Sequence, residues 1–137
     1  MKILIIFFYI FLNIQLLYKM EYIVSEVHKP IKKVKLIDSP YKNKKYQVIF
    51  SNDKKVNFGA KNYNDYIIYY KNKGKEYADK RKELYINRHE KNEEWNNYYT
   101  PGFWSRWLLW NKSTIKQSCI DIKKNFNIKI SLVNKFH

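Results

Sequence analysis

The sequence has little of what catalytic and metal sites are built from: one cysteine, three histidines and three glycines in 137 residues. The single Cys119 cannot form an intramolecular disulfide, which indicates a reducing compartment and a core without covalent cross-links. The glycines do not cluster into a phosphate-binding loop, which argues against nucleotide hydrolysis. A structural zinc site normally takes four Cys or His ligands, and the inventory is Cys119, His28, His89 and His137. We therefore predict no metal and no cofactor.

Pairs of side chains suited to catalysis are also scarce. Cys119 could be a nucleophile activated by His89, but its place on an apolar helical stripe favours buried packing. Glu93 and Glu94 are neighbours on a predicted helix and point in different directions, so they make a poor acid/base pair. We predict that the protein is not an enzyme.

Acidic residues are few: 12 Asp and Glu stand against 27 Lys and Arg, giving a formal net charge of +15. A hydrophobic content of 45% is too high for a disordered chain, and the length suits about one domain with a modest core. The positive charge is concentrated between residues 27 and 63, where ten lysines accompany only Asp38 and Asp53. This combination predicts a folded, basic protein that binds polyanions.

The first nineteen residues stand apart from the rest. A run of ten apolar residues follows Lys2, which resembles the core of a signal peptide. The run lacks an Ala-x-Ala cleavage site and is shorter than the roughly 18 to 20 apolar residues of a clean transmembrane helix. Three interpretations stay open: a signal or membrane anchor, an extension ahead of a start at Met20, and an ordinary buried helix. We assign 1–19 to this segment, with 3–18 as its membrane contact, and 20–137 to one α+β domain.

Three short segments alternate apolar and polar residues, the pattern of half-buried strands. They cover 31–37, 46–50 and 55–58, and a turn is predicted at 51–54. Gly59 ends the third segment, because glycine accepts backbone angles that other residues resist. The pattern predicts a three-stranded antiparallel meander.

After residue 63 the period becomes helical. Asn64-Asp65 predicts the cap of a short helical turn over 66–70, followed by an exposed loop over 71–74. Residues 75–95 contain no Gly or Pro and predict a helix with mixed charges on its solvent side. Its apolar side carries Tyr77, Leu84 and Trp95, with Ala78 and Tyr85 beside them.

The segment TPGFWSRWLLWN, which begins at Thr100, holds three of the four tryptophans. A threonine N-cap followed by Pro101 predicts a well-defined helix start. So apolar a helix has to be covered by other elements. Its one cation, Arg106, predicts an ion pair with a buried carboxylate such as Asp65 or Asp121.

A second amphipathic helix is predicted after Thr114, where Thr-x-x-Gln matches a capping box. Alternation over 128–132 predicts a closing strand that could add to the meander. The predicted fold class is α+β: a small antiparallel β-meander followed by two or three packed helices and the closing strand. The predicted helical core residues are Phe103, Trp104, Trp107, Trp110, Ile115, Ile122 and Phe126.

The basic residues of the meander and of the following helix suit phosphate groups. Each lysine or arginine that neutralises a phosphate releases counterions, and arginine can donate two parallel hydrogen bonds. Lysines on strands also protect sheet edges, so a purely solubilising role stays open. The candidate nucleic-acid contacts are Lys32, Lys33, Lys35, Lys44, Lys45, Lys54, Lys55, Arg81 and Arg88.

Several short motifs follow one another between residues 54 and 126. They are Lys55-Val56-x-Phe58-Gly59-Ala60, Tyr63-x-Asp65-Tyr66, Arg81-Lys82-x-x-Tyr85, Arg88-His89, Trp95 and Thr100-x-Gly102-Phe103-Trp104-Ser105-Arg106-Trp107-Leu108-Leu109-Trp110-Asn111. Together they resemble a small uncharacterised family of large nucleocytoplasmic DNA viruses and some algae. The resemblance implies no particular activity. Together with the single cysteine it favours a reducing host compartment or a virion as the location, or a membrane if the N-terminal segment is retained.

Three functions are compatible with these features. The first is nonspecific binding of DNA or RNA backbones by a small basic module. The second is a structural or virion component whose charge suits an acidic protein partner. The third is a membrane-tethered protein that uses residues 3–18 as an anchor and lysines to hold anionic headgroups.

Overall fold

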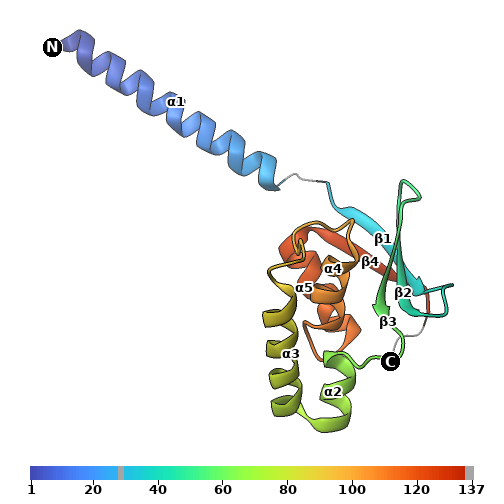
Figure 1. The fold of residues 1–137 in the computed structure, drawn as a ribbon. Coiled ribbons are helices and arrows are strands. Elements are labelled where there is room, and N and C mark those ends of the chain that lie inside the picture. Colours follow the sequence, from blue (N-terminus) through green and yellow to red (C-terminus); the bar gives the residue numbers. More distant parts are fainter. Residues whose placement is uncertain (28–29, 135–137) are drawn as a thin grey trace. The chain divides into compact units, whose positions relative to one another are not determined.

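The computed structural model describes residues 1–27 and 30–134 of the chain. The chain divides into two compact units, Met1–Pro30 and Ile31–His137, each of which is described by itself (Figure 1). The second unit combines a mixed four-stranded sheet with several helices, so the predicted α+β class is confirmed.

The first unit is a single long helix, α1 (Lys2–Val27). Its side chains through Ser25 are all exposed. The segment Lys2–Ser25 has a mean hydropathy of 1.9 and is long and apolar enough to cross a membrane, a test that a signal sequence also passes. A helix of 26 residues is about 39 Å long, more than the ~30 Å of a bilayer's hydrocarbon core. The helix continues without a break through Met20, beyond the apolar run seen in the sequence.

The sheet of the second unit has the strand order β3-β2-β1-β4 (Figure 1). Strands β1 (Lys32–Asp38), β2 (Lys44–Phe50) and β3 (Lys55–Ala60) form the predicted antiparallel meander. The closing strand β4 (Ile128–Leu132) joins it by pairing with β1 in parallel, with Ile130 opposite Val34.

One face of the sheet packs against the C-terminal helices and forms the core of the second unit. Phe58 and Trp104 are both fully buried, and their ring centroids lie 6.1 Å apart. Burial of such large apolar side chains supplies most of the stability of a fold this small. Of the predicted core residues, Phe103, Trp104, Ile115 and Ile122 are buried, whereas Trp107, Trp110 and Phe126 are half-buried at its margin.

Helix α2 (Tyr66–Lys73) begins where the sequence predicts, because the carboxylate of Asp65 accepts a hydrogen bond from the Ile68 N–H at 3.1 Å. It runs on to Lys73, so the predicted loop over 71–74 is wrong except at Gly74. Lysines are favourable in the last turn of a helix, which is why this segment stays helical. Gly74 has a φ of 85° and separates α2 from α3.

Helix α3 (Lys75–His89) ends six residues before the predicted end at Trp95. The carbonyl of Trp95 accepts a hydrogen bond from the Trp107 indole at 2.7 Å, which ties the following loop to the tryptophan-rich segment. The buried side of α3 also differs from the prediction, because the helix packs against the rest of the unit through the residues that were placed beside the predicted apolar stripe. Ala78 and Tyr85 are buried, whereas Tyr77 and Leu84 are exposed.

Helix α4 (Pro101–Trp104) begins at the predicted cap, where the Thr100 hydroxyl accepts from the Phe103 N–H at 3.3 Å. It continues as a π-helix, η1 (Ser105–Leu109), in which the Trp110 N–H donates to the Ser105 carbonyl at 3.0 Å. The predicted regular helical period is therefore wrong here, and the wider turn changes which side chains reach the core. Leu108 and Leu109 are buried, and Trp107 and Trp110 are less so.

Helix α5 (Ile115–Phe126) starts at Thr114, whose hydroxyl accepts from the Gln117 N–H at 3.2 Å, as the capping pattern predicts. Asn127 ends the helix in the left-handed conformation, with a φ of 55°. The chain then enters β4 directly, which places the last strand beside the first.

Candidate functional site

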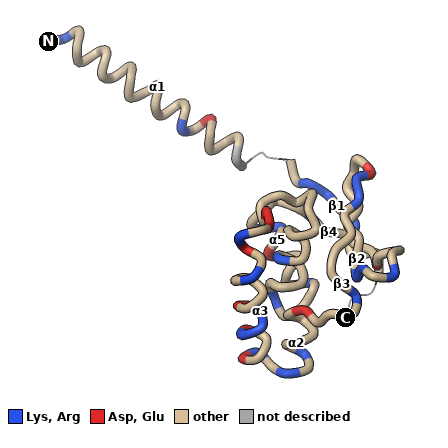
Figure 2. The backbone as a smooth tube through the Cα atoms, viewed as in Figure 1, with Lys and Arg blue, Asp and Glu red and all other residues tan. Residues whose placement is uncertain are grey.

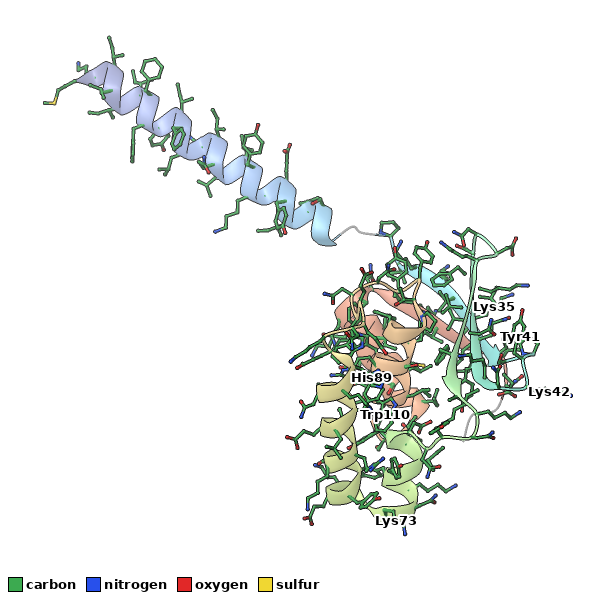
Figure 3. The ribbon with its side chains drawn as sticks, in the orientation of Figure 1. Lys35, Tyr41, Lys42, Lys73, His89 and Trp110 are labelled. Carbon is green, nitrogen blue, oxygen red and sulfur yellow. The ribbon has the colours of Figure 1, made fainter. Side chains whose placement is uncertain are left out.

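Most of the predicted nucleic-acid contacts fall into two groups, and Lys32 and Lys54 belong to neither. The first lies on the face of the sheet opposite the core. Val34 and Leu36 point inward, so Lys33 and Lys35, which alternate with them along β1, point outward. Lys35 is visible on this outer side of β1 in Figure 3. The strand register places Lys129 beside Lys33, and Lys35 in line with Lys55 across β2. We call this group the lysine face: Lys33, Lys35, Lys55 and Lys129.

The lysine face carries little compensating charge. Within residues 30–134, none of its four lysines forms an ion pair. Figure 2 shows basic residues along β1 and β2, whereas α3 carries both signs of charge. Sequence analysis identified three of the four lysines and missed Lys129, which only the pairing of β4 with β1 brings to the group.

Lys32 and Lys54 lie over aromatic rings instead of standing free. The Lys32 ammonium is 4.9 Å from the Tyr98 ring centroid, and that of Lys54 is 4.2 Å from the Tyr99 ring. The contact with the Tyr98 hydroxyl raises the pKa of Lys32. These two predicted contacts therefore tie the sheet to the loop before α4, while remaining exposed enough to carry charge outward.

The second group of predicted contacts lines a cleft of about 590 Å³ in the second unit. Its walls come from the ends of β2 and β3, from α2 and α3, and from α4 and η1. We call it the arginine cleft. It is lined by Lys44, Lys45, Gly59, Ala60, Tyr63, Asn64, Asp65, Tyr69, Arg81, Tyr85, Arg88, His89, Glu93, Pro101, Gly102, Ser105, Leu109 and Trp110.

Lys45 is neutralised within the cleft. Its ammonium lies 2.7 Å from the Asp65 carboxylate, and the two side chains are only 11% and 6% exposed. The same carboxylate caps α2, so this ion pair joins β2 to the start of the helix. Lys45 thus has a partner already, which distinguishes it from the other predicted contacts in the cleft.

Arg81 and Arg88 differ from Lys45 in lacking a carboxylate partner among the described residues. The Arg81 guanidinium lies over the Tyr69 ring at 5.2 Å, and its buried Nε has no hydrogen-bond partner among residues 30–134. Arg88 is exposed and lies about two turns further along α3. Neither arginine forms an ion pair with any residue that the structure describes. With Lys44, they give the cleft an excess of positive charge.

His89 is held in place by Glu93. Its Nδ1 lies 2.7 Å from one oxygen of the Glu93 carboxylate, and the other oxygen accepts from the Trp95 indole at 3.1 Å. Gly102 leaves room for this carboxylate, since a Cβ there would lie 2.5 Å from the second Glu93 oxygen. The second acidic residue of the cleft is therefore also engaged.

An aromatic stack forms the inner wall of the cleft. The rings of Tyr85 and Trp110 are parallel, with centroids 4.4 Å apart and an interplanar angle of 3°. Burial, with a smaller contribution from Glu93, raises the pKa of Tyr85 and keeps its hydroxyl protonated. Figure 3 labels His89 on α3 and Trp110, which directly follows η1; the Tyr85–Trp110 stack joins these two elements.

The predicted ion pair of Arg106 with Asp65 or Asp121 is wrong. Its guanidinium lies over the rings of Trp107 and Trp95, at 4.3 and 5.4 Å, and donates to the Trp110 carbonyl at 3.3 Å. Asp65 is taken by Lys45, and Asp121 accepts from Asn111 at 2.7 Å. Indole faces thus stabilise this cation where a carboxylate was expected.

The Cys119 thiol lies half-buried on α5. Burial raises the pKa of Cys119 to about 11, which makes its thiol a poor nucleophile. Over 1–27 and 30–134, no three His, Cys, Asp or Glu side chains are grouped to hold a metal ion. His28 and His137, the remaining members of the predicted ligand inventory, lie outside the described residues.

Most residues of the cleft were not predicted as functional. Tyr63, Tyr69, Tyr85, His89 and Trp110 come from separate segments that only the tertiary fold brings together. The signal that could have found them was present in the sequence. Many positions of the motifs listed above line this one cleft, among them Gly59, Asp65, Arg81, Arg88, Gly102 and Ser105.

Residues 34–89 match the model of a family of unknown function (DUF5754). The match covers the meander, α2 and α3, and it includes most of the residues that line the arginine cleft. It supports a relationship to an uncharacterised family and assigns no activity. No curated protein and no solved structure matches the chain.

Proposed function

We propose that the second unit binds nucleic acid through its phosphate backbone, with the lysine face as the contact surface. The observation that carries the proposal is a set of four lysines on one face of the sheet that form no ion pair within residues 30–134. Neighbouring strands lie about 4.8 Å apart, so each lysine starts within about 10 Å of another. That distance is close to the Debye length at 0.1 M salt, so their fields add.

The lysine face favours binding without sequence preference. Ammonium groups on flexible side chains act as point charges and follow a phosphate backbone whatever its bases. The surface presents no helix that could enter a major groove. The proposed role is therefore binding without a catalytic step, with an affinity that falls steeply as salt rises.

The test is a salt-titrated binding assay with labelled duplex and single-stranded oligonucleotides. The full chain is kept in neutral detergent because of its apolar helix. In the variant Lys33→Gln/Lys35→Gln/Lys55→Gln/Lys129→Gln, we expect the slope of log affinity against log salt to decrease by about 3 to 4. Negligible binding of the wild-type chain at low salt would refute the proposal.

A matched control separates a local surface from net charge. Lys71→Gln/Lys91→Gln/Lys116→Gln/Lys123→Gln removes the same charge from four exposed lysines of the helices and the α3–α4 loop. We expect this control to keep most of the wild-type slope. An equal decrease of the slope in both variants would show that total charge determines binding, rather than the charge of one face.

A second candidate function is attachment to a membrane through α1. The observation that favours it is the exposed apolar helix of 24 residues, Lys2–Ser25. The corresponding test is expression of the full chain followed by alkaline extraction of membranes. We expect the chain to remain in the pellet, and a chain with Leu12→Arg and Leu16→Arg to be released, since charges inside the apolar span are costly. Release of both chains would argue against an anchor.

A further inference from the structure

The arginine cleft has the dimensions of a small-molecule site. Its volume of about 590 Å³ falls within the ~300–1,000 Å³ typical of ligand pockets. It combines fixed polar groups with aromatic walls, the composition that such pockets share. We propose that the cleft binds a terminal phosphate group, carried either by a nucleoside monophosphate or by the end of a nucleic acid strand.

The charges of the cleft select an anion. Its two carboxylates are already engaged, Asp65 with Lys45 and Glu93 with His89, each at 2.7 Å. Arg81, Arg88 and Lys44 have no carboxylate partner within the described part of the second unit. A dianionic phosphate compensates this excess better than a single carboxylate does.

Arg81 is prepared for such a ligand. The Tyr69 ring supports one face of its guanidinium, which leaves the N–H groups at the edge of the plane for hydrogen bonding. Its Nε is buried and has no acceptor within residues 30–134, an arrangement that costs free energy until an acceptor arrives. Two phosphate oxygens can accept in parallel from the terminal nitrogens of such a guanidinium, and the buried Nε gains an acceptor only if the side chain shifts on binding.

Aromatic side chains suit the remainder of the ligand. Tyr63 lines the cleft and is 74% exposed, so its ring is free to stack on a planar group. The Tyr85–Trp110 stack forms a wall on the opposite elements, and the π-helix that ends just before Trp110 sets the position of that ring. Such local widenings of a helix occur frequently at functional sites.

The site is separate from the lysine face in the residues it uses. A mononucleotide would bind the cleft even if the sheet bound nothing. The end of a strand would use both surfaces, and only in that case does the inference rest on the proposed function.

The experiment is calorimetric titration of the full chain in neutral detergent with four probes. Two are adenosine 5′-monophosphate and adenosine; the others are a pentanucleotide with a 5′-phosphate and the same pentanucleotide with a 5′-hydroxyl. We expect each phosphorylated probe to bind at least about tenfold more tightly than its partner, the effect of losing a charge-assisted hydrogen-bond network. Equal binding within both pairs would overturn the proposal.

The relative affinities identify the source of the phosphate. Tighter binding of the monophosphate than of the phosphorylated pentanucleotide supports a nucleotide ligand. The reverse order supports the end of a strand. Binding of neither phosphorylated probe would overturn the proposal, even if the lysine face still bound long nucleic acid.

Variants assign the binding to the cleft. We expect Arg81→Gln to weaken the phosphorylated probes at least about tenfold, and Arg81→Lys to recover only part of the loss because lysine has no planar fork. Arg88→Gln changes an exposed residue, so it tests the cleft even if Arg81→Gln does not fold. Lys116→Gln removes the same charge from α5 and serves as the control. Unchanged binding in both arginine variants would overturn the proposal.

The two proposals can fail independently. The quadruple variant of the lysine face should leave binding of adenosine 5′-monophosphate unchanged, because none of its four lysines lines the cleft. Arg81→Gln should leave the salt dependence of long duplex binding within about one unit of the wild-type slope. If either variant lost both the binding of adenosine 5′-monophosphate and the binding of long duplex, the proposal of two separate surfaces would be contradicted.

Discussion

The lysine face and the arginine cleft are both basic, yet they are built in different ways. The lysines stand exposed on the strands of the sheet and form no ion pair with the residues that the structure describes, so their position follows from strand register alone. The cations of the cleft are surrounded by engaged carboxylates and aromatic rings. One surface offers charge density, and the other offers charge in a fixed geometry. Net charge alone therefore does not describe how the two surfaces would bind an anion.

The largest expected difference between the two regions is in stability. Asp65→Ala removes the partner of the buried Lys45 and the cap of α2, and we expect a loss of about 3 to 5 kcal/mol of unfolding free energy. Lys35→Ala on the lysine face should change it by less than about 0.5 kcal/mol. Chemical denaturation followed by tryptophan fluorescence measures both.

Asp65→Asn separates the two roles of that carboxylate, since asparagine still caps a helix but carries no charge. We expect it to recover only the smaller, capping part of the loss. Full recovery would mean that the ion pair with Lys45 contributes nothing to stability.

A smaller effect is expected from filling the space beside Glu93. Gly102→Ala places a Cβ 2.5 Å from a carboxylate oxygen, so the Glu93 side chain must move and release His89. We expect a loss of about 1 to 3 kcal/mol and weaker binding in the cleft, with the salt dependence of nucleic acid binding unchanged. Denaturation and calorimetry together check this result.

Gly74→Ala is the companion to that variant. A Cβ at Gly74 meets nothing within 4 Å, but its φ of 85° and ψ of 172° lie in a region that essentially only glycine adopts. We expect a loss of about 1 to 3 kcal/mol with no effect on cleft binding. If this variant also binds the cleft ligand more weakly, general destabilisation rather than displacement of Glu93 explains the Gly102→Ala result.

The smallest expected effect is a loss of unfolding free energy at high pH that depends on Tyr66 in α2, one of the helices that line the cleft. Burial and the hydrogen bond to Asp79 raise the pKa of Tyr66 to about 12. An unfolded tyrosine ionises near pH 10, so this contribution is complete below about pH 10 and is lost as the pH rises towards 12. Denaturation midpoints measured across this range should fall more steeply in the wild type than in Tyr66→Phe. Parallel curves would contradict the assignment.

Local features of the sequence predicted much of the fold. The caps at Asp65, Thr100 and Thr114 mark helix starts in the structure, because each is a short-range hydrogen bond to the next turn. The strands followed from alternation over a few residues. Where prediction failed, a contact with a residue distant in sequence was involved. The predicted helix over 75–95 ends at His89, and the Trp95 carbonyl beyond it accepts a hydrogen bond from the Trp107 indole.

The candidate site was predictable only in part. Lysines of the meander could be listed from charge, but Lys129 joined them through a parallel pairing that no local pattern encodes. The cleft depends on segments from Lys44 to Trp110 meeting in space. Arg106 shows the limit most clearly, since a cation on an apolar helix can be stabilised by indole rings as well as by a carboxylate.

The parallel pairing of β4 with β1 also has a consequence for synthesis on the ribosome. The partners lie almost a hundred positions apart, with Lys32 opposite Ile128 and Leu36 opposite Leu132. Until the last strand leaves the exit tunnel, β1 presents an open hydrogen-bonding edge to its surroundings. During that interval the nascent chain is vulnerable to association with its neighbours on a polysome.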